Sequence, residues 1–318
     1  MKILVTGAGG PAGVCIIKDL KKRHEVIAAD SDILASGLYL VEKSFVVPSV
    51  KNPESNSKIL EIAKNEKVDV IIPTVEEEMI NFARNIVEFK NNGITVIVSN
   101  PQSIDIATNK SSTYKFFQEN TFCPKIYDYK SVEFPCVVKP NTSRGSRGFF
   151  ICHSKEDLDF AIKGNKKGFG DSVIMEYLEG IEFSVYGISD LKGNPLVSVA
   201  NKRITAVGES KKAQIIDDKE ILKAANEIAK KIKLYGPWNV QIMKTSNGPK
   251  LIEVNPRFSG SLSLAIASGL DLVEISMKVF KNEKIEPNEF EYEKDLIMTR
   301  YNEEIFVRPD QSHLIRMI

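Results

Sequence analysis

The sequence predicts an α/β protein in which an open, doubly wound parallel sheet is followed by a second, α+β part. Over the first hundred residues, short and wholly apolar runs such as residues 2–6 alternate with segments of helical periodicity, which is typical of such a sheet. The first run ends in a glycine-rich turn at residues 7–13. After Pro101 the pattern changes to strands that suit a wide antiparallel sheet, interrupted by amphipathic helices.

In the first part, each predicted helix lies between two predicted strands. Strands are expected at residues 2–6, 25–30, 44–48, 68–74 and 94–99. Helices are expected at residues 11–23, 54–67 and 76–92. Ligands of open α/β sheets bind beyond the carboxyl ends of the strands, so the glycine turn, Asp30 and residues 73–78 share the expected ligand-binding edge.

In the second part, one or two helices are expected within residues 103–120, and single helices at residues 154–164, 218–234 and 259–280. Strands are expected at residues 134–140, twice within 171–189, at 194–205, and in a hairpin formed by 236–245 and 248–258. A polar, glycine-containing loop is expected at residues 141–151. The charged tail carries one further strand candidate, residues 304–308.

Length and composition limit the class of protein. The 318 residues suffice for about two domains, and 42% hydrophobic with 27% charged residues supports a buried core. The net charge of +1 gives no reason to expect a polyanion such as DNA as a partner. The four cysteines form no C-x-x-C pair, which favours reduced thiols in the cytosol. No apolar stretch reaches about 18 residues and the first is too short for a signal peptide, so we expect a soluble, cytoplasmic protein.

The glycine-rich turn and Asp30 have the outline of a dinucleotide-binding turn. Glycines after a strand and an acidic residue about 20 positions later are typical of NAD sites. This pattern keeps an NAD-linked oxidoreductase open as an interpretation. The turn also suits a helix N-terminus that faces a carboxylate or phosphate of another ligand.

Residues 248–258 place three polar side chains on one face of a strand. Because alternate residues share a face, Glu253, Asn255 and Arg257 point the same way, and the apolar residues between them point into the core. Pairing with the preceding strand would bring Gln241 beside Glu253. Carboxylate and amide oxygens clustered in this way suit Mg²⁺, which bridges phosphates. A solvated polar face of an edge strand is the alternative.

The loop after Lys139 combines backbone N–H groups, hydroxyls and two arginines, which suits phosphate oxygens. Its first members are Ser143, Arg144, Gly145 and Ser146. The G-x-x-x-x-G-K-[ST] order of a P-loop is absent, so an exposed hairpin loop is the alternative.

Residues 171–189 contain a strand that ends in Glu176, Tyr177 and Leu178, turns, and resumes with Glu182. A chain that leaves a sheet in this way can present backbone groups to a base and a carboxylate to ribose hydroxyls. Glutamates near turns are common, so an ordinary surface turn is the alternative.

In this order and spacing, Lys110, Lys139, the glycine loop, "EYLEG", Gln241 and "EVNPR" resemble the ATP-grasp superfamily. The likeness looks closest to the branch with the carbamoyl-phosphate synthetase large subunit and biotin carboxylase, and to stand-alone carboxylate–amine ligases. It implies an α/β chain with an N-terminal Rossmann-like pre-ATP-grasp domain followed by a two-subdomain α+β ATP-grasp fold. The expected bounds are 1–108 for the first domain, 109–185 for the small subdomain with its glycine-rich lid loop, and 186–318 for the large subdomain with the metal site and tail.

The resemblance implies a role for each matching residue. The ATP phosphates would be bound by Lys110, Lys139, Ser143, Arg144, Gly145 and Ser146. The adenine and ribose would be bound by Glu176, Tyr177, Leu178 and Glu182. Mg²⁺, with Mn²⁺ as an alternative ion, would be coordinated by Gln241, Glu253 and Asn255. Arg257 would stabilise the transferring phosphoryl group, and Arg203 is a weaker match for a basic residue near it.

The implied activity is ATP-dependent ligation of a small carboxylate to an amine or a thiol. Phosphoryl transfer turns the carboxylate into an acyl phosphate, and it needs positioning and charge neutralisation rather than a nucleophilic side chain. The alternatives are phosphorylation of bicarbonate or carbamate, as in carbamoyl-phosphate synthetase, the NAD-linked oxidoreductase, and a nucleotide-binding regulator without catalysis. The charge balance and the lack of a long apolar stretch predict no nucleic-acid or membrane partner, and the resemblance is compatible with a homodimer.

Overall fold

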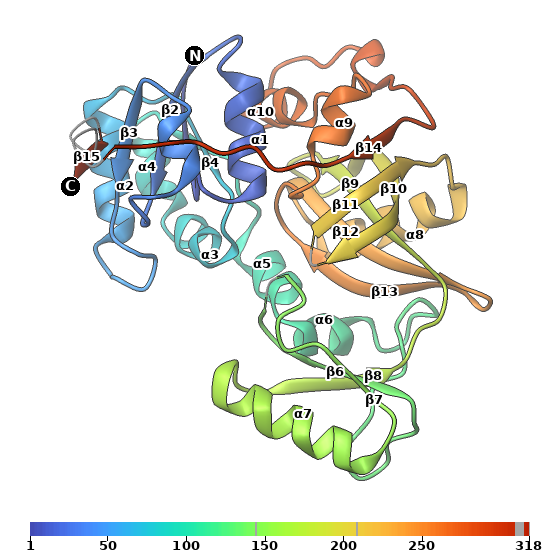
Figure 1. Ribbon diagram of the computed structural model, residues 1–318. Coiled ribbons are helices and arrows are strands. Elements are labelled where there is room, and N and C mark those ends of the chain that lie inside the picture. The colour runs from blue at the N-terminus through green and yellow to red at the C-terminus, as the bar shows by residue number, and fades with distance from the viewer. Residues whose placement is uncertain (144, 208, 309–314, 318) are drawn as a thin grey trace.

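The computed structural model describes residues 1–143, 145–207, 209–308 and 315–317, which form three β-sheets with helices around them (Figure 1). Two six-stranded sheets make up the upper part of the molecule in Figure 1, and a three-stranded sheet lies below them. Helices α5 (Pro101–Thr108) and α6 (Lys110–Phe117) lie between the upper part and the small sheet. Asn109 separates these two helices, because its side chain accepts the Ser112 N–H and caps α6.

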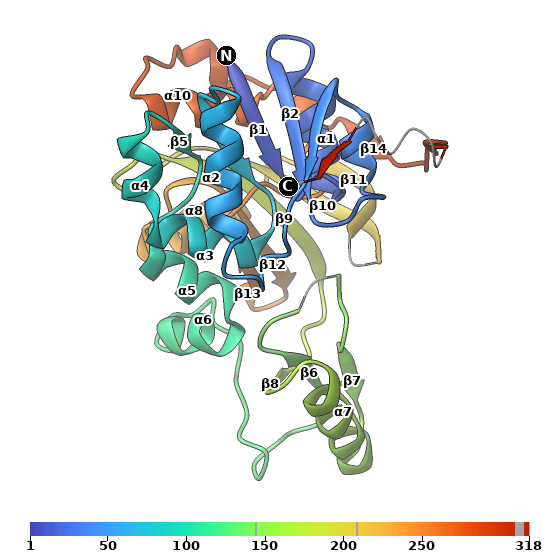
Figure 2. The same ribbon diagram turned by 90° about the vertical axis from the view of Figure 1, so that its left-hand side faces the viewer.

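The first sheet is parallel throughout and has the order β15-β3-β2-β1-β4-β5. Its strands are β1 (Lys2–Thr6), β2 (Glu25–Asp30), β3 (Lys43–Val46), β4 (Val70–Pro73), β5 (Thr95–Val96) and β15 (Ile315–Met317). Ile3 and Val5 pack with helix α1 (Pro11–Leu20), whereas Leu4 packs with α2 (Ser55–Asn65) on the other face. In the view of Figure 2, α2 lies in front of this sheet. The predicted doubly wound sheet is confirmed.

Two segments expected as single helices are each divided. Residues 76–92 form α3 (Glu76–Arg84) and α4 (Ile86–Asn91), because the Asn85 side chain donates to the Asn81 carbonyl and competes with the helical backbone. Residues 259–280 contain α9 (Ser263–Ala267) and α10 (Leu272–Lys281), separated by Gly269 at φ +97°. None of the helices in the described ranges is long and apolar enough to cross a membrane.

The second sheet is antiparallel, with the order β13-β12-β9-β10-β11-β14. Its strands are β9 (Ile181–Ser189), β10 (Pro195–Val207), β11 (Glu209–Ile215), β12 (Gly236–Thr245), β13 (Gly248–Asn255) and β14 (Ile297–Thr299). Val185 and Val240 pack with α8 (Lys219–Ile232) on one face, whereas Tyr186 and Ile188 pack with α10 on the other.

The third sheet has three strands in the order β7-β6-β8, namely β6 (Cys136–Pro140), β7 (Phe150–Cys152) and β8 (Ser172–Glu176). Helix α7 (Lys155–Gly168) packs on this sheet, and its N-cap Ser154 accepts the Asp157 N–H. The expected boundary between residues 185 and 186 falls inside strand β9, which belongs to the second sheet.

The C-terminal tail does not form the strand expected at residues 304–308. These residues extend along the surface, and the Phe306 side chain is 92% exposed. An apolar run becomes a strand only where it can pair with the edge of a sheet. The tail pairs with sheet edges before and after residues 304–308, but not within them. Strand β14 pairs with β11 in the second sheet, and β15 pairs with β3 in the first (Figure 1).

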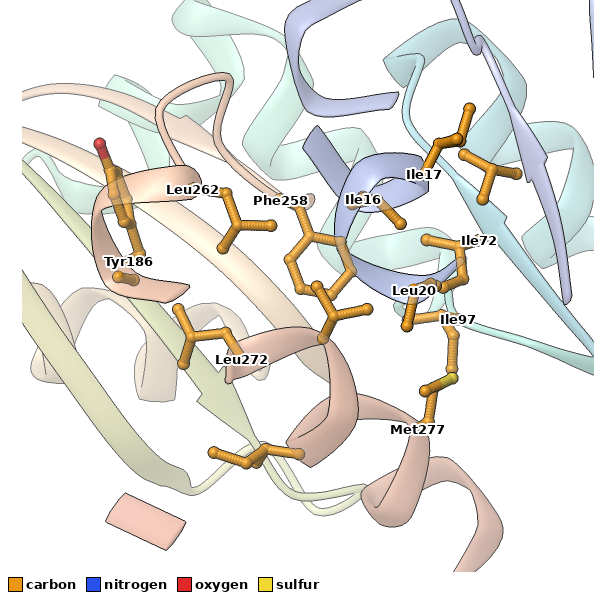
Figure 3. Packing of buried hydrophobic residues seen from close by; sticks show 14 of the residues in the cluster. Ile16, Ile17, Leu20, Ile72, Ile97, Tyr186, Phe258, Leu262, Leu272 and Met277 are labelled. Carbon is orange, nitrogen blue, oxygen red and sulfur yellow. The ribbon is translucent and has the colours of Figure 1, made fainter. Parts of the chain in front are cut away.

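One apolar cluster joins the first and second sheets. Ile16 and Leu20 of α1 lie opposite Phe258 and Met277 from the other part of the chain (Figure 3). All four side chains are at most 3% exposed. The N-terminal domain therefore packs on the second sheet through a continuous apolar core.

We expect Gly187→Ala to destabilise the second sheet strongly. A Cβ atom at Gly187 would lie 2.1 Å from the Trp238 ring, and Trp238 is 1% exposed. Overpacking of a rigid core of this kind lowers the free energy of unfolding by about 1–3 kcal/mol. Urea denaturation followed by the fluorescence of Trp238, the single tryptophan, measures the change.

Gly164→Ala in α7 is the matched control, because a Cβ there meets no atom within 4 Å. It should raise the free energy of unfolding by about 0.5–1 kcal/mol through helix propensity. Equal stability of the Gly187→Ala variant and the wild type would contradict the close packing.

Candidate active site

A cleft of about 1200 Å³ lies between the three sheets. One wall is the carboxyl edge of the first sheet, with the glycine turn, Asp30 and the start of α3. The opposite wall consists of side chains from β9, β10, β12 and β13, and the loop between β6 and β7 lines it from the small sheet. Most residues predicted as site residues therefore face one cavity.

The hairpin of β12 and β13 supplies the acidic and amide groups of this wall. Gln241 pairs with Glu253, and Asn239 pairs with Asn255, so the predicted neighbourhood of Gln241 and Glu253 is confirmed. Asn255 is 3% exposed, whereas the Glu253 side chain keeps 24% of its surface. Four oxygen-bearing side chains thus lie on this wall of the cleft.

Two buried lysines meet at Glu253. Lys110, the first residue of α6, places its Nζ 3.2 Å from Glu253 Oε1. Lys139, near the end of β6, is 6% exposed, and burial lowers the pKa of its ammonium group to about 7 against the opposing effect of Glu253. The carboxylates of Glu253 and Glu182 both counteract this effect of burial on Lys139.

Tyr114 holds Lys139 in place. The Lys139 ammonium donates to the Tyr114 hydroxyl at 2.7 Å and to the Ile252 carbonyl at 2.9 Å. The Tyr114 hydroxyl donates to the same carbonyl at 2.6 Å. Burial raises the pKa of Tyr114 well above its usual value, so this residue stays a neutral donor. Sequence reasoning missed Tyr114, whose only signal is its position one helical turn after Lys110.

Glu182 and Arg203 form a second ionic contact. Arg203 Nη1 lies 2.7 Å from Glu182 Oε1 across β9 and β10. Burial raises the pKa of the Glu182 carboxyl, although Arg203 lowers it. Both side chains line the cleft, so the predicted ribose-binding and substrate-phosphate residues are direct neighbours.

Arg257 contacts the N-terminal domain. Its Nε donates to Glu76 Oε1 at 2.9 Å, and its Nη2 lies 2.7 Å from the same oxygen. Nη2 also donates to Asn255 at 3.3 Å, and Nη1 donates to the Phe258 carbonyl at 3.0 Å. Sequence reasoning placed residues 73–78 at the ligand-binding edge but gave Glu76 no role.

The predicted base-binding segment lies away from this cluster. Glu176 Oε1 accepts the Lys125 N–H at 2.8 Å, Tyr177 is 42% exposed, and Leu178 packs against the core beneath α8. The structure thus does not bring these three residues to the lysines and the hairpin.

The loop between β6 and β7 faces the cleft. Ser143, Gly145 and Ser146 line it together with Arg147. Gly145 and Ser146 both have positive φ, at +64° and +59°, which turns successive backbone N–H groups in one direction. Arg144, the fourth residue predicted in this loop, lies outside the described residues.

Asp30 has a structural role in the glycine turn. Its Oδ2 accepts the Gly9 N–H at 2.8 Å and its Oδ1 accepts the Asp32 N–H at 3.0 Å. Both carboxylate oxygens therefore stabilise their own loops. This contact disfavours the ribose-binding role that an NAD site would give this residue.

The donor set of the hairpin fits Mg²⁺. Gln241, Glu253 and Asn255 offer one carboxylate and two amide oxygens, the hard donors that Mg²⁺ prefers. Within the described ranges, no three His, Cys, Asp or Glu side chains form a metal cluster. Few protein ligands suffice for Mg²⁺, because this ion takes further ligands from substrate phosphates.

Two family models match parts of the chain. Residues 168–304 match a model described as "ATP-grasp in the biosynthetic pathway with Ter operon", and residues 3–97 match one described as "PylC-like, N-terminal domain". Biotin carboxylase from Campylobacter jejuni, solved with β,γ-ATP, superposes with a TM-score of 0.72 at 19% identity, over 91% of this chain and 72% of that one.

Two curated relatives extend over most of the chain. The carbamoyl phosphate synthase large chain of Saccharolobus islandicus is 25% identical over 326 residues, or 88% of this chain and 30% of that protein. The present chain thus spans less than a third of that relative's length. The formate-dependent phosphoribosylglycinamide formyltransferase of Bacteroides thetaiotaomicron is 24% identical over 304 residues, or 87% of this chain and 76% of that protein.

Lys139 should give the free energy of unfolding a distinct pH dependence. Its folded pKa of about 7 lies below the ordinary value of 10.5, so the unfolded chain binds one more proton between these two values. The free energy of unfolding therefore rises with pH in this window. Between pH 7 and pH 9 we expect a rise of about 1–2.5 kcal/mol that Lys139→Met abolishes.

Urea denaturation of the ligand-free protein at both pH values measures this rise. Lys223→Met, which removes an exposed lysine of α8, is the control and should keep the wild-type pH dependence. An unchanged pH dependence in Lys139→Met would show that the Lys139 pKa is not lowered.

Proposed function

We propose that this chain, which belongs to the ATP-grasp superfamily, is an ATP- and Mg²⁺-dependent ligase that joins a carboxylate to an amine or a thiol. The observation that carries this proposal is the pair of buried lysines, Lys110 and Lys139, that line a large cleft beside Glu253. A polyphosphate supplies the negative charge that these groups lack. The matches to ATP-grasp models and enzymes support the same nucleotide.

The ATP phosphates bind between the lysines and the loop after β6. Lys110 and Lys139 contact phosphate oxygens from below, and the backbone of Ser143, Gly145 and Ser146 covers them. Arg144 belongs to the same proposed set. Because the loop lies on the small sheet, movement of this sheet would open and close the cleft and exclude water from the acyl phosphate.

The nucleoside binds along the segment between β8 and β9. Glu182 takes the ribose hydroxyls, and Tyr177 and Leu178 frame the base with the Glu176 carboxylate as acceptor. These roles rest on the resemblance of "EYLEG" to the family.

Gln241, Glu253 and Asn255 would hold Mg²⁺, with Mn²⁺ as an alternative ion. The ion would neutralise charge on the phosphates that it bridges. Glu253 would then exchange part of its contact with Lys110 for the metal, which frees the lysine for the phosphate oxygens.

The chemistry starts when a carboxylate oxygen of the substrate attacks the γ-phosphorus. The bond between this phosphorus and the oxygen that bridges it to the β-phosphate breaks, and ADP leaves. Arg257 and Arg203 stabilise the charge on the transferring phosphoryl group. The amine then attacks the acyl carbon, phosphate leaves with the bonding electrons, and the amine loses its proton to solvent.

The acid and the amine are expected on the wall formed by the first sheet. There the glycine turn and the start of α1 line the cleft opposite the phosphate cluster. The formyltransferase relative, which matches 87% of this chain, is named as formate-dependent. Formate is a small carboxylate, and this name supports a small acid as the substrate.

The free thiols of all four cysteines favour a cytoplasmic location. We propose a homodimer on the family resemblance alone.

We expect MgATP, and not NADH, to raise the melting temperature of the protein, because a ligand of the native state stabilises it by mass action. A shift with NADH and none with MgATP would contradict the proposed function.

Glu253→Gln should lower ATP turnover by at least about 100-fold while the protein stays folded, because the metal and Lys110 lose their shared carboxylate. Phosphate release in a screen of amino acids and small acids measures the turnover, and circular dichroism checks the fold. Glu119→Gln, the same change at an exposed position in the turn after α6, is the control. Full activity of Glu253→Gln would disprove the metal assignment.

A further inference from the structure

The contact of Arg257 with Glu76 joins residues that lie 181 positions apart in the sequence. Glu76 is the first residue of α3 in the N-terminal domain, whereas Arg257 follows β13 in the second sheet. Both side chains are largely buried, at 14% and 18% exposed. Partial burial reduces solvent screening, so this ion pair is stronger than one at the surface.

The contacts of Arg257 fix its orientation completely. Nε donates to Glu76, Nη1 to the Phe258 carbonyl and Nη2 to Asn255. A guanidinium carries five N–H donors in one plane. Nη2 also lies 2.7 Å from Glu76 Oε1, so these contacts use four of the five donors. One N–H of Nη1 therefore remains for a ligand in the cleft, and Glu76 and Asn255 set the plane in which it lies.

Glu76 is itself held by the fold. It begins α3, where the helix dipole favours a negative charge. The N-terminal domain that carries α3 packs on the second sheet through the apolar cluster of Ile16, Leu20, Phe258 and Met277. Phe258 belongs to this cluster and directly follows Arg257, so the cluster and the ion pair fix the same short segment.

We propose that Glu76 is a positioning residue for phosphoryl transfer, which acts through Arg257. This inference rests on the proposed function. Glu76 holds the guanidinium so that its remaining N–H donor, on Nη1, faces the transferring phosphoryl group. It does not touch ATP, and it makes the transfer step depend on contact between the N-terminal domain and the second sheet.

A transition-state mimic separates this role from nucleotide binding. MgADP alone contacts the lysines and the metal residues, whereas MgADP with aluminium fluoride also presents a mimic of the transferring group to Arg257. Titration calorimetry gives the dissociation constant of MgADP with and without aluminium fluoride. In the wild type, we expect aluminium fluoride to lower the dissociation constant of MgADP.

Glu76→Gln keeps the shape of the side chain and removes its charge. It should bind MgADP within twofold of the wild type but lose about 10–100-fold in the affinity of the aluminium fluoride complex, as is usual for a residue that orients a ligand-binding group. Glu76→Asp, which restores the charge, should recover part of this loss. Glu88→Gln, the same change at an exposed position of the neighbouring helix α4, should behave as the wild type.

The double variant shows whether Glu76 acts through Arg257. If it does, Glu76→Gln combined with Arg257→Lys binds the aluminium fluoride complex no more weakly than Arg257→Lys alone. Additive losses, or full tightening in Glu76→Gln, would overturn the inference while leaving the proposed function intact. Failure of the wild type to bind MgADP would instead overturn the proposed function and, with it, this role of Glu76.

Discussion

The structure of the cleft depends on two buried lysines, Lys110 and Lys139, that lie near the carboxylates of Glu253 and Glu182. Burial of a cation without full compensation is costly, and the lowered pKa of Lys139, about 7, reports that cost. The surrounding structure makes this arrangement tolerable, since Tyr114 and the Ile252 carbonyl accept hydrogen bonds from Lys139. Under the proposed function, the ATP phosphates would compensate this cost when they bind.

The parts of the site that follow from local periodicity could be predicted from the sequence. Alternation along β13 places Glu253 and Asn255 on one face, and a hairpin turn sets the register that brings Gln241 beside them. The parallel sheet followed from its buried apolar strands. The breaks at Asn85 and Gly269 were missed, because a side-chain hydrogen bond and one residue of positive φ interrupt otherwise continuous helical patterns.

Contacts between distant segments could not be predicted in this way. No period relates Glu76 to Arg257 or Tyr114 to Ile252, since these pairs arise only when separate sheets pack together. The apolar cluster around Phe258 brings the N-terminal domain against the second sheet and so creates the ion pair. Asp30 shows the opposite case, in which a recognisable local pattern serves the backbone of a turn instead of a cofactor.

In the proposed function, one wall of the cleft neutralises phosphates and the other binds the acceptor. The central claim is that a carboxylate is activated as an acyl phosphate. Turnover of MgATP with amines and ¹⁸O-labelled carboxylic acids, followed by ³¹P NMR, tests it most directly. The account predicts that the released phosphate carries ¹⁸O from the acid and that ADP is the other product. Phosphate without ¹⁸O, or release of AMP and pyrophosphate, would contradict it.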